Sequence, residues 1–417
     1  MLYLRILSTV FAGILVTVLL RPTISAYLVT RTQENPEASI RMASHVTGED
    51  ARYHYALGSL SFKDRDKAKA AEAINHYRES LRHDPTRALA WLDLSKIYKE
   101  NGQEAHAEFT VRQAVSVDRA NPRVLWEAGI LYLLDGRIVD AAPFFRAYLT
   151  ITPSDQEHVS ALLQGVGARA AFIMERVVPE TYASRSKYFR FLINHKQYSQ
   201  LWDTWEIRRT WKPANKDYLV FCDFLIERGD LEAAQPVWAE LVENGHPARK
   251  ERSAANLLYN GDFEYPIHDG GFDWKIGKAE GVTIGVDPEV KKTGSSSLAA
   301  TFNGKTNPGV YVAQQVVRVK PNEQYHVSAV VKTENLTTKN GILLEVLDHM
   351  RGAWSARSEV LTGTSNWQPV ELTFAAPANC NAVRIGLKRE RSEKFDNKIC
   401  GKVWIDSVSM QASKGDR

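Results

Sequence analysis

The chain has 417 residues, of which 44% are hydrophobic and 24% carry a charge, and its formal net charge is +4. This composition excludes a disordered or collagen-like chain, and the length allows two or three domains, each with its own core. The small net charge, without a dense basic block, gives no support to nucleic-acid binding by bulk charge.

The first 29 residues are predicted to direct the chain to a membrane. Arg5 precedes an apolar run from Ile6 to Leu20, which is intermediate in length between a signal-peptide core and a full membrane span. Two interpretations remain open: an uncleaved signal anchor that forms a transmembrane helix, or a signal peptide removed near the Ile-Ser-Ala at 24–26. We therefore expect an exported, extracytoplasmic soluble body that is tethered to the membrane or, alternatively, secreted after cleavage.

Residues 50–250 contain a repeat with a period of about 34 residues, which is typical of a helix–turn–helix solenoid. Alanines, tyrosines and glycines recur at this spacing: Ala73, Ala107 and Ala141; Tyr98 and Tyr132; Gly102 and Gly136. Alanine lets two helices approach closely, and glycine ends the first helix of a pair where a positive φ is needed. One helix pair cannot bury its apolar stripe alone, so the pairs must stack.

Residues 91–115, WLDLSKIYKENGQEAHAEFTVRQAV, carry the W-x2-L, Tyr, Gly and Ala positions of tetratricopeptide repeats. The array resembles this family in about five units, although residues 154–185 are too divergent to assign. The resemblance implies an α-solenoid with a groove for a protein partner. The expected groove residues are Lys96, Lys99, Arg123 and Trp126. Alternatively, these four are ordinary surface and packing residues.

From Asn256 onward the sequence has the period of strands. The stretch "NLLYNGDFE" at 256–264 predicts a strand and an Asn-Gly turn. Alternating positions then recur in five short segments: Tyr325, Val327, Ala329 and Val331; Ile342, Leu344 and Val346; Val370, Leu372 and Phe374; Val383, Ile385 and Leu387; Val403, Ile405 and Ser407. A period of two with one apolar face predicts antiparallel sheets around a shared core, as in a sandwich or jelly roll.

The segments "NGDFE", "GSSSL", "PNEQY" and "VWIDSV" follow one another in an order that resembles CenC-like carbohydrate-binding modules, over residues 256–411. The resemblance implies a galactose-binding-like jelly roll that binds an oligo- or polysaccharide. Sugar sites combine flat apolar rings with polar groups. The expected sugar contacts are Trp354, Trp274, Phe272, Tyr311 and Arg351. For Trp274, a role as a core or loop anchor is an equal alternative.

Asp262 and Glu264 lie two residues apart, so their side chains leave the same face of a strand. The resemblance implies a structural calcium ion held by these carboxylates and by Asp406 of the last strand. The alternative is a turn aspartate and an exposed glutamate. A pair of glycosidase carboxylates is rejected, because the two residues lie at a domain edge without a further acid.

Three cysteines occur, without a Cys-x-x-Cys pair that would indicate structural zinc. Cys222 falls in a helical pattern and is predicted to be a small buried apolar residue. Cys380 and Cys400 could form a disulfide across a loop of about 20 residues in an exported protein. Two unrelated thiols are the alternative.

The sequence thus predicts an α-then-β multidomain chain: a membrane anchor at 1–29, a tetratricopeptide-like α-solenoid at 50–250 and an antiparallel β-sandwich at 256–411. No nucleophile elbow, His-Glu-x-x-His or phosphate-binding glycine loop occurs. We therefore expect a non-enzymatic, membrane-tethered adaptor that binds a protein and a polysaccharide, in surface glycan or exopolysaccharide assembly or export. No cofactor is expected to be required, and the calcium ion that the resemblance implies would be structural. The alternatives are a pure protein–protein scaffold and an accessory subunit of a glycoside-active enzyme.

Overall fold

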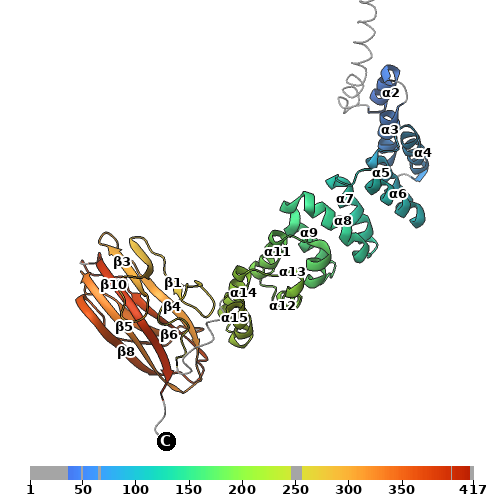
Figure 1. The fold of residues 1–417 in the computed structure, drawn as a ribbon. Helices are drawn as coiled ribbons and strands as arrows, with labels where there is room; N and C mark the ends of the chain where they lie inside the picture. Colours follow the sequence, from blue (N-terminus) through green and yellow to red (C-terminus); the bar gives the residue numbers. More distant parts are fainter. Residues whose placement is uncertain (1–35, 48–49, 64–66, 246–255, 396, 414–417) are drawn as a thin grey trace, which may run out of the picture. The chain divides into compact units, whose positions relative to one another are not determined.

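The computed structural model describes residues 36–47, 50–63, 67–245, 256–395 and 397–413. The chain divides into two compact units, Met1–Lys212 and Pro213–Arg417. Helices make up the first unit, and the second unit combines the last two helices with all the strands of the described residues (Figure 1). The predicted anchor at 1–29 lies outside the ranges above. Within those ranges, no helix is both long enough and apolar enough to cross a membrane.

The helices follow one another as hairpins, as the 34-residue period predicts (Figure 1). In the first unit they are α2 (Pro36–Thr47), α3 (Ala51–Lys63), α4 (Lys67–His83), α5 (Ala88–Glu100), α6 (Glu104–Val117), α7 (Pro122–Leu134), α8 (Ile138–Ile151), α9 (Gln156–Gly165), α10 (Ala170–Phe172), α11 (Tyr182–Asn194), α12 (Tyr198–Glu206) and α13 (Arg208–Trp211), with the short turns η1 (Pro153–Asp155) and η2 (Ile173–Val177). The second unit begins with α14 (Asn215–Glu227) and α15 (Leu231–Gly245). The repeated alanines Ala73, Ala107 and Ala141 are buried, so they fill the helix contacts for which they were predicted.

The first helix of each clear repeat ends in the predicted left-handed glycine. Gly102 and Gly136 both have a φ of +70°. The amide that follows Gly102, that of Gln103, donates to the carbonyl of Tyr98 at 2.8 Å, which is a Schellman cap. Gly167 and Lys196 take the same left-handed conformation after α9 and α11. The divergent stretch at 154–185 therefore contains a helix, α9, that ends in the same way as the first helices of the clear repeats.

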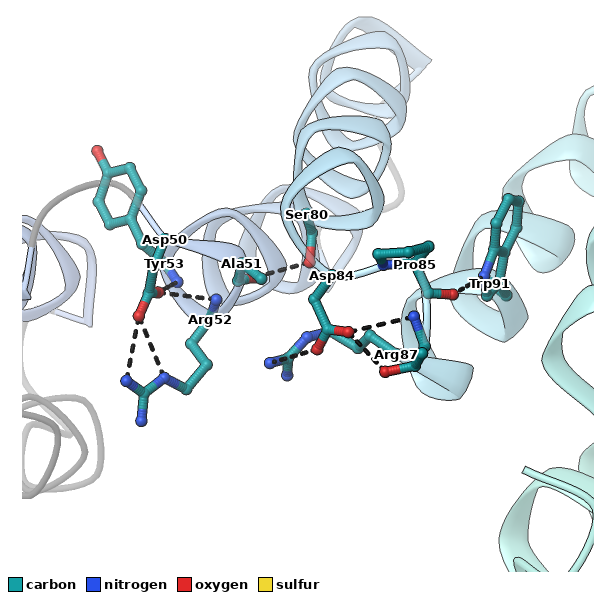
Figure 2. Close-up of polar contacts among 10 residues, drawn as sticks. Asp50, Ala51, Arg52, Tyr53, Ser80, Asp84, Pro85, Arg87 and Trp91 are labelled. Carbon is teal, nitrogen blue, oxygen red and sulfur yellow. Dashed lines mark hydrogen bonds and ion pairs between the residues drawn. The ribbon is translucent and has the colours of Figure 1, made fainter. Parts of the chain in front are cut away.

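Side chains fix the first hairpin and its junction with the next helix (Figure 2). Asp50 accepts hydrogen bonds from the backbone amides two and three residues later, at 2.9 and 3.0 Å, and so caps α3. The Ser80 hydroxyl of α4 donates to the Ala51 carbonyl of α3 at 2.6 Å. The Trp91 indole of α5 donates to the Pro85 carbonyl at 2.8 Å. These bonds define how α3, α4 and α5 follow one another.

The strands of the described residues form two antiparallel five-stranded sheets. Sheet A has the order β1-β4-β9-β6-β7, and sheet B has the order β2-β3-β10-β5-β8. The strands are β1 (Lys275–Ile276), β2 (Val282–Asp287), β3 (Ser297–Asn303), β4 (Val310–Arg318), β5 (Gln324–Leu336), β6 (Leu343–Asp348), β7 (Ser355–Arg357), β8 (Gly363–Ala375), β9 (Ala382–Arg389) and β10 (Cys400–Ala412). The two sheets enclose one apolar core, which confirms the predicted sandwich.

The predicted inward residues of β5, β6, β8 and β9 are buried, as alternation requires. The last strand differs from the prediction after Ile405. Its register shifts between Asp406 and Ser409, and Ser407 has a φ of +51°. This β-bulge turns Ser407 away from the core and brings Val408 inward instead.

The opening stretch "NLLYNGDFE" forms no regular strand, although it lies beside β10. The Leu257 amide donates to the Met410 carbonyl at 2.8 Å, and the Val408 amide donates to the Gly261 carbonyl at 2.7 Å. The predicted turn is present, with a φ of +51° at its asparagine. A Cβ atom on Gly261 would lie 2.0 Å from the Val408 oxygen. Glycine is therefore needed here because the two backbones nearly touch.

Cys222 is buried in α14, as predicted. The predicted disulfide is wrong, because Cys380 and Cys400 are both free thiols. Cys400 begins the 13-residue strand β10, while Cys380 interacts with Tyr325, which pairs with Ala412 at the other end of that strand. A strand of this length spans roughly 40 Å, whereas a disulfide needs Cα atoms about 6 Å apart.

Candidate ligand-binding face of the β-sandwich

Polar side chains gather on the outer face of sheet A. The inward positions of β4, β6 and β9 hold the apolar core, so the alternate positions face outward. The register of the strands places seven of these outward residues next to one another: Tyr311 and Gln314 on β4, Arg384, Gly386 and Lys388 on β9, Glu345 on β6 and Arg357 on β7. We call these seven residues the sheet A face.

Gly386 lies at the middle of the sheet A face, paired with Gln314 on one side and Glu345 on the other. A Cβ atom at this position would lie 2.8 Å from Cδ1 of Tyr311 and 2.7 Å from the carbonyl oxygen of Ala313. The Tyr311 ring therefore lies against the glycine, in space that another residue would fill. This contact gives the ring a fixed position on the face.

Glu345 is the hub of the charged groups on this face. Its side chain is only 1% exposed, yet it contacts the Arg357 guanidinium at 2.8 Å, the Lys388 ammonium at 3.1 Å and the Tyr311 hydroxyl. Burial acts to raise the pKa of Glu345, but the Tyr311 and Lys388 hydrogen bonds outweigh it and lower this pKa below its usual range. Glu345 is therefore a carboxylate at neutral pH, and it orients the three groups around it.

The Tyr311 ring has a cation beside it as well as a carboxylate. The Lys388 ammonium lies 5.2 Å from the ring centroid, which is cation–π distance. Burial and the Glu345 carboxylate both raise the pKa of Tyr311, so its hydroxyl stays protonated. The face therefore offers an aromatic ring, fixed donors and a carboxylate within three neighbouring strands. Such a set can recognise a ligand with hydroxyl groups and apolar C–H faces.

Helix α14 borders the sheet A face at one end of its central strands. Gly271, before β1, donates from its amide to the Asp223 carboxylate at 2.8 Å. His349, after β6, donates from Nε2 to the Ile226 carbonyl at 3.1 Å. Since β4 and β9 lie between β1 and β6, α14 crosses the ends of those two strands. The helix thereby forms a wall beside the face.

Two titratable groups where α14 meets the sandwich have shifted pKa values. Burial raises the pKa of Asp223, despite the hydrogen bond from the Gly271 amide. Burial also lowers the pKa of His349, against the stabilising Ile226 carbonyl, and the Arg384 guanidinium lowers it further. Burial in the contact between helix and sheet favours the neutral form of both groups.

The expected sugar contacts are not all on this face. Trp274 is fully buried, lies 5.4 Å from the Phe263 ring and is unavailable to a ligand, so its alternative role as a core anchor applies. Phe272 packs against Trp238 of α15. Trp354 is half-buried and packs on Phe374 of the core, with ring centroids 5.5 Å apart.

Of the five expected sugar contacts, Tyr311 is the one that reaches the sheet A face. Arg351 is exposed in the loop after β6, where its amide donates to Asp348 at 3.1 Å. Sequence reasoning missed Glu345, Gly386 and Lys388. The outward position of Lys388 could have been found from the alternation of β9, but the burial of Glu345 depends on the neighbouring strand.

The expected calcium ligands are held by backbone amides. Glu264 accepts from amides of residues 295–296 at 2.8 and 3.2 Å, and Asp406 accepts from amides of residues 292–293 at 2.7 and 3.0 Å. Asp262 is exposed. Over the described ranges, these three carboxylates do not come together as a group of metal ligands. The donors that surround Glu264 and Asp406 suit a carboxylate and oppose a cation, so the residues present do not fit a calcium ion.

The expected partner groove lies on α5 and α7, where Lys96, Lys99 and Trp126 contact neighbouring helices. Lys96 and Arg123 both bind Glu127, with a distance of 2.8 Å for Arg123. Lys99 donates to a carbonyl of α7 at 2.7 Å. The Trp126 ring stacks on a histidine ring of α9, with centroids 5.7 Å apart. The structure thus brings Lys96 and Arg123 together on Glu127 and gives Lys96, Lys99 and Trp126 contacts between repeats.

Two family models match parts of the chain. A family described as "Carbohydrate binding domain" matches residues 255–391, and one described as "Tetratricopeptide repeat" matches residues 65–125. The second match covers α4, α5 and α6, and the first begins at the opening segment of the sandwich and ends just after β9.

The curated relatives are much longer than the segment that they share with this chain. A tRNA(Glu)-specific nuclease WapA of Bacillus subtilis subsp. natto is 29% identical over 170 residues, which are 39% of this chain and 7% of the relative. The tRNA nuclease WapA of Bacillus subtilis strain 168 is 28% identical over the same shares. The chain thus spans about 7% of the length of these relatives.

Solved structures that resemble the chain include carbohydrate-binding modules. One described as "CBM4 structure and function" is 15% identical, covers 37% of this chain and 99% of its own, and has a TM-score of 0.28. A "Xylan-Binding Domain from CBM 22" is 14% identical, covers 39% of this chain and 97% of its own, and has a TM-score of 0.28.

Proposed function

We propose that this chain, which carries tetratricopeptide repeats followed by a carbohydrate-binding domain, is a non-enzymatic adaptor that holds a polysaccharide on its sandwich and a protein partner on its repeats. The proposal places an exported body at a membrane, tethered through the apolar run at 6–20, where it would serve the assembly or export of a surface glycan. This part rests on the sequence of the N-terminal segment.

The sheet A face is the observation that carries the proposed sugar binding. The Tyr311 ring supplies a surface for the apolar face of a sugar, and Lys388 and Arg357 supply donors that Glu345 holds in place. Gln314 lies beside these groups, paired with Gly386 on the neighbouring strand. Fixed polar groups of this kind lose little freedom when a ligand binds.

The repeats supply the proposed protein contact through α5 and α7. Lys96, Glu127 and Arg123 form a connected charged surface across neighbouring hairpins. The Asp93 and Glu127 carboxylates raise the pKa of Lys96 although burial opposes them, so its ammonium is charged at neutral pH. A partner with charged side chains of both signs fits this surface.

Retention of the full-length protein on immobilised neutral and acidic polysaccharides tests the sugar binding. We expect retention on at least one polysaccharide, and Tyr311→Ala should weaken it by about tenfold, equal to the loss of about 1.4 kcal/mol. The control is His326→Ala, which changes an exposed residue on β5 of sheet B and should leave retention intact. Retention that Tyr311→Ala does not change would exclude the sheet A face.

A protein–protein scaffold without sugar binding is the second candidate function. It is favoured by the burial of Trp274 and by the packing of Trp354 on the core, which leave Tyr311 as the aromatic residue of the face. Failure of the wild-type protein to bind any polysaccharide, together with capture of a defined protein through Lys96 and Arg123, would favour this candidate.

A further inference from the structure

Four side chains that can bind metals meet in the first helical hairpin of the first unit. His76, Glu79 and His83 lie on α4 at intervals of three and four residues, so they share one face of that helix. His54 lies on α3, the other helix of the hairpin. Neither the sugar site nor the expected partner groove uses any of the four.

The potential ligand atoms are close enough to share one ion. One ligand atom each from His54, Glu79 and His83 lies within 4.8 Å of the other two. The Nδ1 atoms of His54 and His76 are 3.3 Å apart. Bond lengths of about 2.0–2.1 Å place the ligands of a tetrahedral zinc ion roughly 3.4 Å from one another. Small side-chain movements would therefore bring the atoms of His54, Glu79 and His83 to coordination distance, and His76 lies beside His54 as a fourth ligand that such movements would recruit.

The backbone that carries these side chains is fixed on both sides of them. The Ser80 hydroxyl bonds the Ala51 carbonyl at 2.6 Å, one turn before His54 (Figure 2). One turn after His54, Gly58 lies so close to Tyr77 that an added Cβ atom would be 3.0 Å from its ring. The two helices therefore cannot separate without losing buried contacts, and the ligands are presented by a rigid hairpin.

One histidine has a carboxylate near the nitrogen that would face away from the ion. The Nδ1 atom of His76 faces His54, while its Nε2 atom lies 3.8 Å from the Glu72 carboxylate. This distance is too long for a hydrogen bond, and the exposed Glu72 side chain would have to move closer to hold Nε2–H and leave Nδ1 for a metal. Glu79 is bonded instead to Arg82, at 2.8 Å, and would have to exchange this exposed partner for the ion.

We propose that His54, His76, Glu79 and His83 bind a divalent transition-metal ion, with zinc as the expected metal. Three imidazoles and one carboxylate suit zinc and its neighbours, whereas calcium and magnesium prefer an all-oxygen set. The ion would cross-link α3 to α4 and strengthen the first hairpin of the array. This inference does not depend on the proposed function.

Titration of the full-length protein, freed of any purification tag and stripped with a chelator, tests the site directly. Isothermal titration calorimetry with zinc chloride should show that each protein molecule binds one zinc ion tightly. We expect His54→Ala and His83→Ala each to weaken this binding by about tenfold or more, as lost ligation requires. His326→Ala, an exposed histidine of the second unit, is the matched control and should bind zinc as the wild type does.

Two further measurements separate a lost ligand from a lost fold. Cobalt(II) in place of zinc should give the visible absorption of a four-coordinate site in the wild type and lose it in His83→Ala. Zinc should raise the melting temperature of the wild type and leave that of His83→Ala unchanged. The proposal would be overturned if His83→Ala bound zinc as tightly as the wild type does. It would also be overturned if the wild type bound no zinc ion tightly.

Discussion

The Asp223 carboxylate of α14 accepts a 2.8 Å hydrogen bond from the backbone amide of Gly271, which lies 48 residues further along the chain. Next to this bond, Trp238 of α15 is only 8% exposed and packs against Tyr259 and Phe272, with ring centroids 5.1 and 6.3 Å apart. The last helical hairpin therefore belongs to the same compact unit as the sandwich.

This contact predicts that the sandwich is less stable when the hairpin is removed. A fragment of residues 256–417 exposes Phe272 and loses the partner of Gly271, whereas a fragment of residues 213–417 keeps both. We expect the shorter fragment to melt several degrees lower, and Trp238→Ala in the longer one to cost about 3–5 kcal/mol. Differential scanning calorimetry measures both effects, and equal melting temperatures for the two fragments would contradict the contact.

Gly261 provides a test of the close approach between the opening segment and β10. In Gly261→Ala, the new Cβ atom would lie 2.0 Å from the Val408 oxygen, so one backbone has to move. We expect a loss of about 2 kcal/mol or more in urea unfolding. Gly285→Ala on β2 is the control, because nothing lies within 4 Å of its Cβ position. A similar, small effect of both changes would argue against the register of β10.

His349 should make the second unit less stable in mild acid. Its pKa lies below the usual 6.5, mainly because it is buried. The unfolded chain therefore binds more protons between the folded pKa and 6.5, and the free energy of unfolding falls as the pH drops through that window. His349→Gln keeps an N–H donor for Ile226 without titrating.

Urea unfolding at about pH 7.5 and about pH 5.5 measures this dependence. The wild type should lose more stability than His349→Gln between the two values. A wild type and variant with parallel pH profiles would show that protonation of His349 does not act on folding.

The three cysteines should react with a thiol reagent at different rates, because they differ in solvent exposure. Cys400 is exposed, whereas Cys222 and Cys380 are buried, and burial raises the pKa of both buried thiols. Thiolates are the reactive form, so a thiol reagent should label Cys400 first in the native protein and all three after unfolding. Peptide mapping identifies the labelled positions. A peptide that links Cys380 to Cys400 would contradict the distance between them.

Sequence periodicity predicted the repeats where a backbone conformation favours one residue type, so that this residue recurs at a fixed spacing. Gly102 and Gly136 mark helix ends because a left-handed φ favours glycine. The later unit ends at Lys196, which takes the same conformation without the glycine signal, with a φ of 53°. The sequence does not assign the stretch at 154–185, because its spacing departs from 34 residues, although Gly167 follows α9 as Gly102 and Gly136 follow their helices.

The candidate site was harder to predict, because it depends on pairing between strands. Alternation identifies the outward residues of each strand but not which of them lie side by side. Glu345 and Lys388 come together only through the β6–β9 register. The need for glycine at position 386 is seen only once the Tyr311 ring is placed against it. Aromatic residues off the strand faces, such as Trp274, gave a false signal because irregular segments also fill the core.

A matched pair of lysines tests the central proposal most directly. On the outer face of sheet A, the Lys388 ammonium lies 5.2 Å from the centroid of the Tyr311 ring. In sheet B, the ammonium of Lys332 on β5 lies 5.5 Å from the centroid of the Trp404 ring on β10. Titration of full-length protein with the polysaccharide that it retains should show Lys388→Ala weakened by about tenfold and Lys332→Ala unchanged. Equal affinity of the two variants would contradict sugar binding on the sheet A face.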